Sequence, residues 1–314
     1  MGKMQGMLGA AGAVLTAEVL LSAYFYRRTM KRGRAKVERT MKMAGTDWSQ
    51  YAEKIGKCKE YMLSQPHEDV WIHSEDGLRL HGTFFPNGGS GRVILCFHGY
   101  TSEGMKDYIG LSDYYLRRGY AMLLVDARAH GRSEGTYIGF GCLDRMDALQ
   151  WIAWLLETCG EDCSIILHGT SMGAATVLMT SGLKLPRQVK GIVSDCGFTS
   201  PKEVFTHVLH TMYHIPAFPI IQIADRMNRK LAGYGMDTCN AAREVKKSVT
   251  PTLFIHGSAD TFVPVCMCEE MYQNCAAEKW KLIVPGAAHA ESYYMDTGRY
   301  EKALDLFLKE TLFQ

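Results

Sequence analysis

The stretch Ser164-Ile-Ile-Leu-His-Gly-Thr-Ser-Met-Gly-Ala-Ala-Thr-Val-Leu-Met179 decides the fold. Residues 164–168 read as a buried strand, and residues 174–179 read as the first turns of a helix. Between them, Gly169-Thr-Ser-Met-Gly173 has the pattern G-x-S-x-G, which is typical of a turn that lifts a serine hydroxyl clear of a sheet. The helix N-terminus behind that turn offers unpaired N–H groups to a developing negative charge. The stretch therefore predicts an α/β fold with Ser171 as a nucleophile.

Short apolar segments alternate with helical patterns along much of the chain. Alternating apolar and polar residues predict a hairpin over 69–73 and 78–85. Continuous apolar runs predict buried strands over 92–97, 121–126, 164–168, 189–193, 251–255 and 280–284, and helical periodicity covers 143–156, 202–209, 269–277 and 300–312. This order predicts a mostly parallel sheet with helices on both faces. In such sheets the active site lies at the carboxyl ends of the strands.

Polar residues follow several of these strands in the order Ser…Asp…His. Asp260 would orient His289, whose ordinary pKa lies near physiological pH, and His289 would take the proton of Ser171 during attack. The backbone N–H groups of Met172 and Tyr100 would bind the oxyanion. The alternative for Ser171 is the N-cap of an ordinary helix. An N-cap role does not explain why Asp260 and His289 follow later strands in this order, so the sequence favours a catalytic triad.

Other residues could fill two of these roles. Asp195 also follows a predicted strand and is an alternative to Asp260 as the acid. His98, His130 and His168 are alternatives to the predicted base, but His98 and His168 adjoin glycine turns, where we expect structural hydrogen bonds. The position after the last predicted strand favours His289 as the base.

Composition excludes several classes of function. The 314 residues, 47% hydrophobic and 22% charged, suit a large globular domain. Eight Lys or Arg against two Glu in residues 1–40 leave the remaining chain net negative, which argues against a nucleic-acid partner. The ten cysteines lack zinc-ligand spacing and read as reduced thiols, and His207, His210 and His214 lack a companion carboxylate, so no metal site is expected.

The N-terminal segment Met7–Tyr26 is apolar over the length of a membrane-spanning helix, apart from Glu18. Following arginines resemble a basic anchor and predict a single membrane span with the catalytic domain in the cytoplasm. A cleaved signal peptide and an amphipathic helix are the alternatives. The expected organisation is an anchor with a basic collar over 1–40, a helical linker over 41–67 and a catalytic domain over 68–314.

The motifs His98-Gly-Tyr100, Asp126-Ala-Arg-Ala-His-Gly-Arg-Ser133, Gly169-Thr-Ser-Met-Gly-Ala174, His256-Gly-Ser-Ala-Asp260 and Gly286-Ala-Ala-His289 resemble those of the α/β-hydrolase superfamily. Over about 68–313 the chain looks like the serine esterase, lysophospholipase and serine-aminopeptidase-like group, especially small membrane-anchored bacterial members. The resemblance implies an eight-stranded sheet, no cofactor, and a cap after the sixth strand, here Thr199 to about Met236. Ala129 replaces a glycine of the family's motif, which is expected to affect loop conformation.

These observations predict a serine hydrolase that cleaves a carboxylic ester through an acyl-enzyme on Ser171. Apolar stripes in the predicted cap, together with Tyr100, would bind a small-molecule ester or acyl substrate. Simple packing of the cap on the sheet edge is the alternative. Peptide or amide hydrolysis and acyl transfer use the same triad and stay open, as does the oligomeric state. A non-catalytic membrane-tethered binding module would lack a member of the triad.

Overall fold

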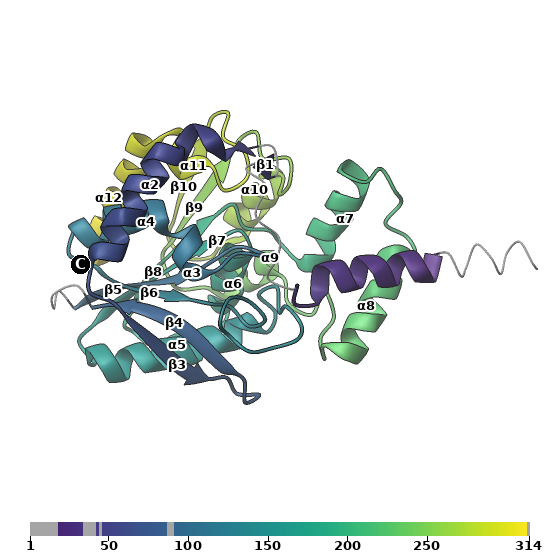
Figure 1. The fold of residues 1–314 in the computed structure, drawn as a ribbon, viewed down its shortest axis with the longest axis horizontal. Helices are drawn as coiled ribbons and strands as arrows, with labels where there is room; N and C mark the ends of the chain where they lie inside the picture. The colour runs from purple at the N-terminus through teal and green to yellow at the C-terminus, as the bar shows by residue number, and fades with distance from the viewer. Residues whose placement is uncertain (1–17, 34–41, 44–45, 87–90, 313–314) are drawn as a thin grey trace, which may run out of the picture.

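The computed structural model describes residues 18–33, 42–43, 46–86 and 91–312. Among them, eight strands form one sheet in the order β10-β9-β8-β7-β5-β6-β4-β3 (Figure 1). The strands from β10 to β6 run parallel to their neighbours, whereas β3 pairs with β4, and β4 with β6, in antiparallel fashion. The chain has the α/β-hydrolase fold, as the sequence predicts.

The sheet strands are β3 (Glu68–His73), β4 (Arg79–Phe85), β5 (Arg92–Phe97), β6 (Ala121–Val125), β7 (Ser164–Thr170), β8 (Val189–Asp195), β9 (Thr252–Gly257) and β10 (Lys279–Val284). The helices are α2 (Ala52–Ser64), α3 (Gly104–Asp107), α4 (Ile109–Arg117), α5 (Asp144–Cys159), α6 (Met172–Thr180), α7 (Pro201–Thr211), α8 (Ile220–Leu231), α9 (Ala241–Glu244), α10 (Val265–Asn274), α11 (Ser292–Met295) and α12 (Thr297–Leu312). A small antiparallel pair, β1 (Lys42–Met43) and β2 (Thr46–Asp47), and two 3-10 turns, Trp48–Tyr51 and Val245–Lys247, complete these elements.

Two hydrophobic clusters cover the two faces of the sheet. In β5, Leu95 faces the cluster under α5, α6 and α10, while Cys96 faces the cluster under α2, α4 and α12. Each side chain is fully buried because both faces of a parallel sheet are covered by helices. This explains why the inner strands read as continuous apolar runs in the sequence.

Several helix boundaries differ from the predicted ones. The helix predicted over 269–277 is α10, which begins at Val265, directly after Pro264, and ends before Cys275, whose backbone is extended. Proline is favoured near a helix start because it needs no N–H partner there. Helix α5 runs three residues beyond the predicted 143–156 and ends at Gly160, where a φ of 86° takes the backbone out of the helix. In the linker predicted as helical, the helix α2 is preceded by β1, β2 and a 3-10 turn.

Helices α7 and α8 project from one end of the sheet and lie in the segment predicted as the cap (Figure 1). They follow β8, which is the sixth strand of the sheet along the chain. A capping bond from Glu203 N–H to the Ser200 hydroxyl, with proline at the next position, begins α7. Leu209, Ile220 and Ile221 form a small separate core between the two helices. The cap is therefore packed internally as well as onto the sheet.

Residues 18–30 form a helix that lies across α7 and α8 (Figure 1). Its buried residues Ser22, Tyr26 and Met30 are four positions apart, so one stripe of the helix packs against the body. The first part of the predicted anchor, residues 7–17, lies outside the described residues. Within the described ranges, no helix is long and apolar enough to cross a membrane. The predicted membrane span therefore has no support from these residues.

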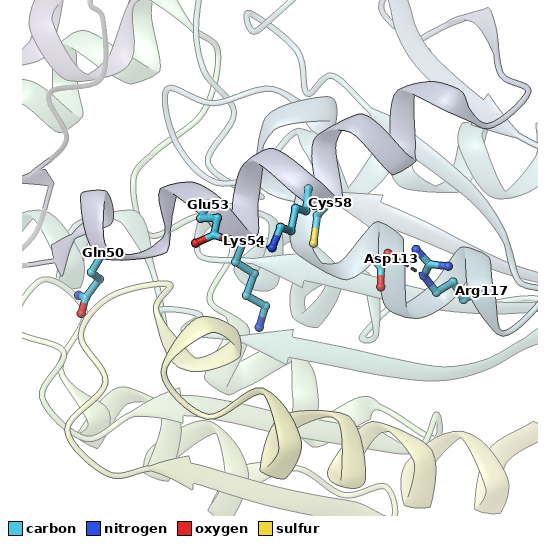
Figure 2. Close-up of a pocket in the computed structure, with 7 residues that line it drawn as sticks. Gln50, Glu53, Lys54, Cys58, Asp113 and Arg117 are labelled. Atoms are coloured by element: carbon cyan, nitrogen blue, oxygen red, sulfur yellow. Dashed lines mark hydrogen bonds and ion pairs between the residues drawn. The ribbon is translucent and has the colours of Figure 1, made fainter.

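A surface cavity of about 440 Å³ lies between α2 and α4 (Figure 2). Its lining is largely charged and includes Lys54, Asp113 and Arg117, of which the last two are ion-paired at 2.8 Å. None of the triad residues lines it. The chemistry predicted from the sequence therefore belongs to a different part of the molecule.

Candidate active site

Ser171 occupies a strained turn between β7 and α6. Its φ of 55° and ψ of −111° lie in a region that non-glycine residues rarely adopt, and its side chain makes no capping bond to the helix. A Cβ on Gly173 would lie 1.9 Å from the Phe97 carbonyl oxygen, and one on Gly169 would lie 2.2 Å from the Gly173 carbonyl oxygen. Both glycines are thus required by close backbone approach. The turn presents the serine hydroxyl at the carboxyl end of the sheet, and the N-cap alternative finds no hydrogen bond to support it.

The structure brings Ser171, His289 and Asp260 together. His289 Nε2 lies 2.8 Å from the Ser171 hydroxyl oxygen, and His289 Nδ1 lies 2.7 Å from Asp260 Oδ2. The serine comes from the β7–α6 turn, the aspartate from the loop after β9 and the histidine from the loop after β10. In this arrangement Nδ1–H donates to the carboxylate and leaves Nε2 free to accept the serine proton. The geometry is that of a nucleophile, a base and an orienting acid.

The carboxylate of Asp260 is held by four groups. Burial alone would raise the pKa of Asp260, but His289 and His256 outweigh it and hold this pKa well below its usual range. The second oxygen, Oδ1, accepts the backbone N–H groups of Phe262 and Val263, each at 2.9 Å. His256 lies 3.3 Å from Oδ2. Asp260 is therefore ionised at neutral pH and fixed in orientation.

Asp195, the alternative acid, lies elsewhere in the site. Its Oδ2 accepts the Tyr300 hydroxyl at 3.0 Å, and its backbone carbonyl accepts the Ser171 N–H at 2.8 Å. Burial raises the pKa of Asp195 to about 6. Its side chain is not hydrogen-bonded to His289, which is bonded to Asp260 instead. Asp195 supports the turn through its main chain.

The alternative bases make structural hydrogen bonds. His98 Nε2 accepts the Ala127 N–H at 3.0 Å, and His130 Nε2 accepts the Thr101 N–H at 3.2 Å. His168 is buried, with its Nδ1 2.9 Å from the Tyr115 hydroxyl. Burial lowers the pKa of both His130 and His168 to about 3. His130 is therefore neutral and holds the loop at Thr101, whereas His168 is a neutral side chain of the core.

The residues predicted to supply the oxyanion donors lie near the serine. Met172 is the first residue of α6, and Tyr100 follows Gly99, where an added Cβ would lie 3.4 Å from the Ser171 Cβ. Among the described residues, neither the Tyr100 nor the Met172 amide has a hydrogen-bond acceptor. Two free amides beside a serine hydroxyl can bind the oxygen of a tetrahedral intermediate.

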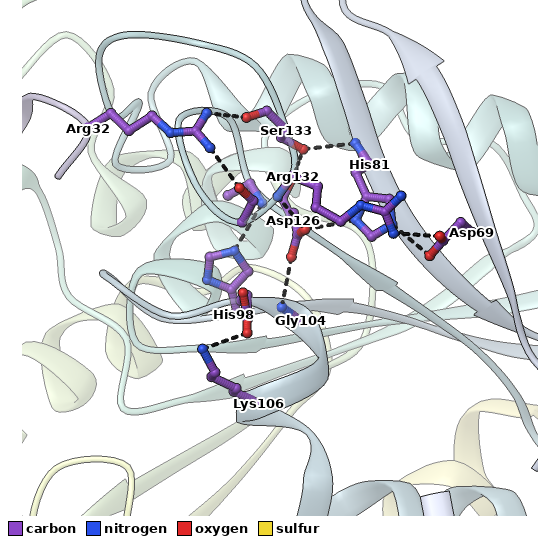
Figure 3. Close-up of polar contacts among 12 residues, drawn as sticks. Arg32, Asp69, His81, His98, Gly104, Lys106, Asp126, Arg132 and Ser133 are labelled. Carbon is purple, nitrogen blue, oxygen red and sulfur yellow. Dashed lines mark hydrogen bonds and ion pairs between the residues drawn. The ribbon is translucent and has the colours of Figure 1, made fainter. Parts of the chain in front are cut away.

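Polar contacts hold the segment from Asp126 to Ser133 in place (Figure 3). Asp126 accepts the His81 ring at 2.8 Å and the Arg132 and Gly104 amides at 2.9 and 3.2 Å. Ala129 has a φ of 62°, a conformation that favours glycine. The substitution expected from the sequence to affect loop conformation thus stands at a left-handed position. The sequence analysis did not identify His81, because its place on a strand with alternating apolar and polar residues gave no signal for this contact.

An aromatic ring packs against His289, and two others join the loop of Tyr100 to the cap. Phe262 lies 5.0 Å from the His289 ring, Tyr100 stacks on Phe140 at 5.3 Å, and Phe140 meets Phe205 of α7 at 5.0 Å. These distances are those of ordinary aromatic contacts. Phe262 is thus an aromatic neighbour of His289, and Phe140 links Tyr100 to Phe205 of the cap.

The three histidines of the cap region form no metal site. His207 Nε2 lies 2.9 Å from the Thr261 carbonyl oxygen, and His210 accepts the Ala217 N–H at 3.2 Å. In the part of the chain that the structure describes, no group of three or more His, Cys, Asp or Glu side chains could hold a metal ion.

The sequence matches the X-Pro dipeptidyl-peptidase (S15) family over residues 17–218. It is also similar to the uncharacterized protein YqkD of Bacillus subtilis, with 28% identity over 223 residues that cover 71% of this chain and 72% of the relative. The family match spans β5 with Tyr100 in the loop after it, the elbow at Ser171 and α7 of the cap, and it ends before α8, Asp260 and His289.

Solved structures with this fold include esterases. The Pyrococcus furiosus esterase PF2001 superposes with a TM-score of 0.65 and 23% identity, covering 79% of this chain and 92% of that one. Est1E of Butyrivibrio proteoclasticus, solved with bound ferulic acid, gives a TM-score of 0.59 at 15% identity, covering 78% of this chain and 100% of that one. At these identities the likeness establishes the fold.

Proposed function

The chain belongs to the X-Pro dipeptidyl-peptidase (S15) family and is a serine hydrolase of the α/β-hydrolase type, and on that premise we propose that it cleaves carboxylic esters through an acyl-enzyme on Ser171. The substrate class is a small ester with an apolar acyl group. The observation that carries this proposal is an aromatic lining, in which Phe262 packs against His289, Tyr100 packs against Phe140, and Phe140 packs against Phe205 of the cap. Such a lining suits an apolar acyl group because it buries its surface without hydrogen-bonding demands.

Acylation begins with proton transfer. As the Ser171 oxygen attacks the ester carbonyl carbon, its proton passes to His289 Nε2, 2.8 Å away. The imidazolium that forms is stabilised by the ionised Asp260. The carbonyl oxygen becomes an oxyanion and accepts the Met172 and Tyr100 amides. Removing one such donor in other serine hydrolases costs about 10²–10³ in rate.

Collapse of this intermediate breaks the bond between the carbonyl carbon and the alcohol oxygen. His289 returns its proton to the leaving alcohol, and the acyl group stays on Ser171 as an ester. A water molecule then loses a proton to His289 and attacks the acyl carbon. The bond between that carbon and the Ser171 oxygen breaks, and His289 gives its proton to this oxygen, which releases the acid and restores the serine hydroxyl. An acceptor alcohol or amine in place of water would give acyl transfer by the same steps.

Peptide hydrolysis is the second candidate function, because the matching family is named for X-Pro dipeptidyl-peptidase activity. Turnover of p-nitrophenyl esters from acetate to decanoate should be compared with that of Ala-Pro and Gly-Pro p-nitroanilides. The ester proposal predicts a higher kcat/KM for the esters, with an optimum at an intermediate chain length. A higher kcat/KM for the X-Pro anilides would reject the ester proposal and favour the peptidase.

The cellular location stays a prediction. Ten unpaired cysteines, eight of them buried, support a reducing compartment such as the cytoplasm. Attachment to a membrane through residues 7–26 has no support from the described part of that segment and stays a prediction, which reporter fusions after Gly33 would test.

A further inference from the structure

The helix over residues 18–30 ends against the loops that build the active site. Its last carbonyl, that of Met30, accepts the Ile138 N–H at 2.9 Å. Just beyond the helix, the Arg32 N–H donates to the Thr136 carbonyl oxygen at 2.8 Å. The C-terminal end of this helix is therefore fixed to the segment that precedes Phe140 in the aromatic lining.

Tyr100 bonds to the same helix end. Its hydroxyl donates to the Arg28 carbonyl oxygen at 3.2 Å. A carbonyl in the last turn of a helix lacks its usual partner four residues ahead, and here the Arg32 amide is bonded to Thr136 instead. Tyr100 supplies the missing donor. Burial raises the pKa of Tyr100 to about 12, so the hydroxyl keeps its proton at neutral pH.

Aromatic contacts join the helix, the cap and the oxyanion loop. Phe25 of the helix meets Tyr213, just after α7, with ring centroids 5.0 Å apart. The Tyr100 ring stacks on Phe140, which in turn contacts Phe205 of α7. Phe25 and Phe205 also pack on the same small core of Leu209, Ile220 and Ile221, so aromatic side chains connect the helix, the cap and the oxyanion loop.

Arg32 adds a second link between the helix and the site. Its guanidinium donates to the backbone carbonyls of Ser133 and Gly131 (Figure 3). His130, next to Gly131, accepts the amide of Thr101, the residue after Tyr100. The helix thus restrains the oxyanion loop both at Tyr100 directly and at Thr101 through this turn.

We propose that Tyr100 is a positioning residue through which the helix over residues 18–30 sets the geometry of the oxyanion hole. The backbone amide of Tyr100 binds the oxyanion, and its hydroxyl and ring fix where that amide points. The helix over residues 18–30 therefore contributes to the geometry of the active site. The inference rests on the proposed function, because it assigns a role to one oxyanion donor of that reaction.

The first test replaces Tyr100 by phenylalanine in the full chain, which keeps the ring and removes the bond to Arg28. With p-nitrophenyl butyrate we expect kcat to fall about ten-fold and KM to change less than about two-fold, since a displaced donor weakens transition-state binding alone. Tyr24→Phe is the control, because Tyr24 lies on the same helix and is 58% exposed. An unchanged kcat in Tyr100→Phe would overturn the proposal.

The second test loosens the helix without touching the oxyanion loop. Arg32→Ala should lower kcat several-fold with little change in KM, whereas Arg27→Ala, which removes the same charge from an exposed position of the helix, should not. An equal fall in both variants would trace the effect to charge and overturn the proposal. Melting temperatures within about 4 °C of wild type would show that each variant is folded.

The two proposals fail in different ways. A wild-type protein that hydrolyses no ester and takes up no fluorophosphonate would overturn the proposed function, and this inference with it. A wild-type protein that is active, with Tyr100→Phe and Arg32→Ala equally active, would overturn only the role of the helix.

Discussion

Replacing Asp260 by asparagine changes one atom and should remove almost all activity. The carboxylate bonds to His289 through Oδ2 and to the amides of Phe262 and Val263 through Oδ1. Asparagine has one oxygen and one NH₂ group, so it cannot accept on both sides. If its oxygen keeps the two amides, the NH₂ group faces Nδ1, and the ring proton must then move to Nε2.

A protonated Nε2 cannot take the proton of Ser171. The same tautomer error in another serine hydrolase lowers kcat by about 10⁴, which corresponds to about 5 kcal/mol of transition-state stabilisation. We therefore expect a fall of about 10⁴ in kcat for Asp260→Asn. KM should change little because the substrate does not contact this side chain.

Asp195→Asn is the matched control. Its new side-chain oxygen can still accept the Tyr300 hydroxyl, and its backbone bond to Ser171 is retained. We expect kcat to change by less than about ten-fold, or ~1.4 kcal/mol. The assay is initial-rate hydrolysis of p-nitrophenyl butyrate, with melting temperature as the test of folding. A larger loss in Asp195→Asn than in Asp260→Asn would refute the assignment of the acid.

Three further predictions concern stability. Gly173→Ala places a Cβ 1.9 Å from the Phe97 carbonyl oxygen and should lower the free energy of unfolding, measured in urea, by at least about 2 kcal/mol. Gly56→Ala in α2, which has open space around it, should raise this free energy by about 0.5–1 kcal/mol. An equal effect of the two substitutions would contradict the close packing at Gly173. Ala129→Gly removes the strain of a φ of 62° but increases the conformational entropy of the unfolded chain. The free energy of unfolding should therefore stay unchanged or rise by up to about 1 kcal/mol. A marked fall in melting temperature would contradict this conformation. Burial raises the pKa of Asp195 to about 6, so the folded state holds this proton more tightly than the unfolded state, and the contribution of this group to stability falls as the pH rises from about 4 to 6. Asp195→Asn should remove that fall, by up to about 3 kcal/mol between pH 4 and 7, and denaturation curves that keep the wild-type pH dependence would contradict the buried, raised-pKa state.

The sheet could be predicted because its inner strands are buried on both faces. Such strands read as apolar runs, and Ile165 to Leu167 or Val93 to Phe97 leave little choice of structure. The site residues follow from the same property, because polar residues at the ends of buried strands stand out. The helix α4 has the helical spacing of Leu111, Tyr114 and Tyr115 but was not predicted, since its aromatic residues also suit a strand.

Long-range pairing was not predictable from the sequence. The local sequence around Asp195 and Asp260 does not show which carboxylate contacts His289, because that contact depends on how the loops after β8 and β9 are placed. The N-terminal segment shows the same limit. Its apolar composition predicts a membrane span, whereas the contacts of Tyr26 and Met30 with the catalytic domain depend on where the chain returns.

The central claim is that Ser171 is an activated nucleophile. Its most direct test is the reaction of the full-length protein with a fluorophosphonate probe, followed by peptide mass spectrometry. We predict one adduct per chain, on Ser171, that is lost in Ser171→Ala and strongly slowed in His289→Ala. Labelling that persists in Ser171→Ala, or wild-type protein that takes up no probe while folded, would contradict the claim.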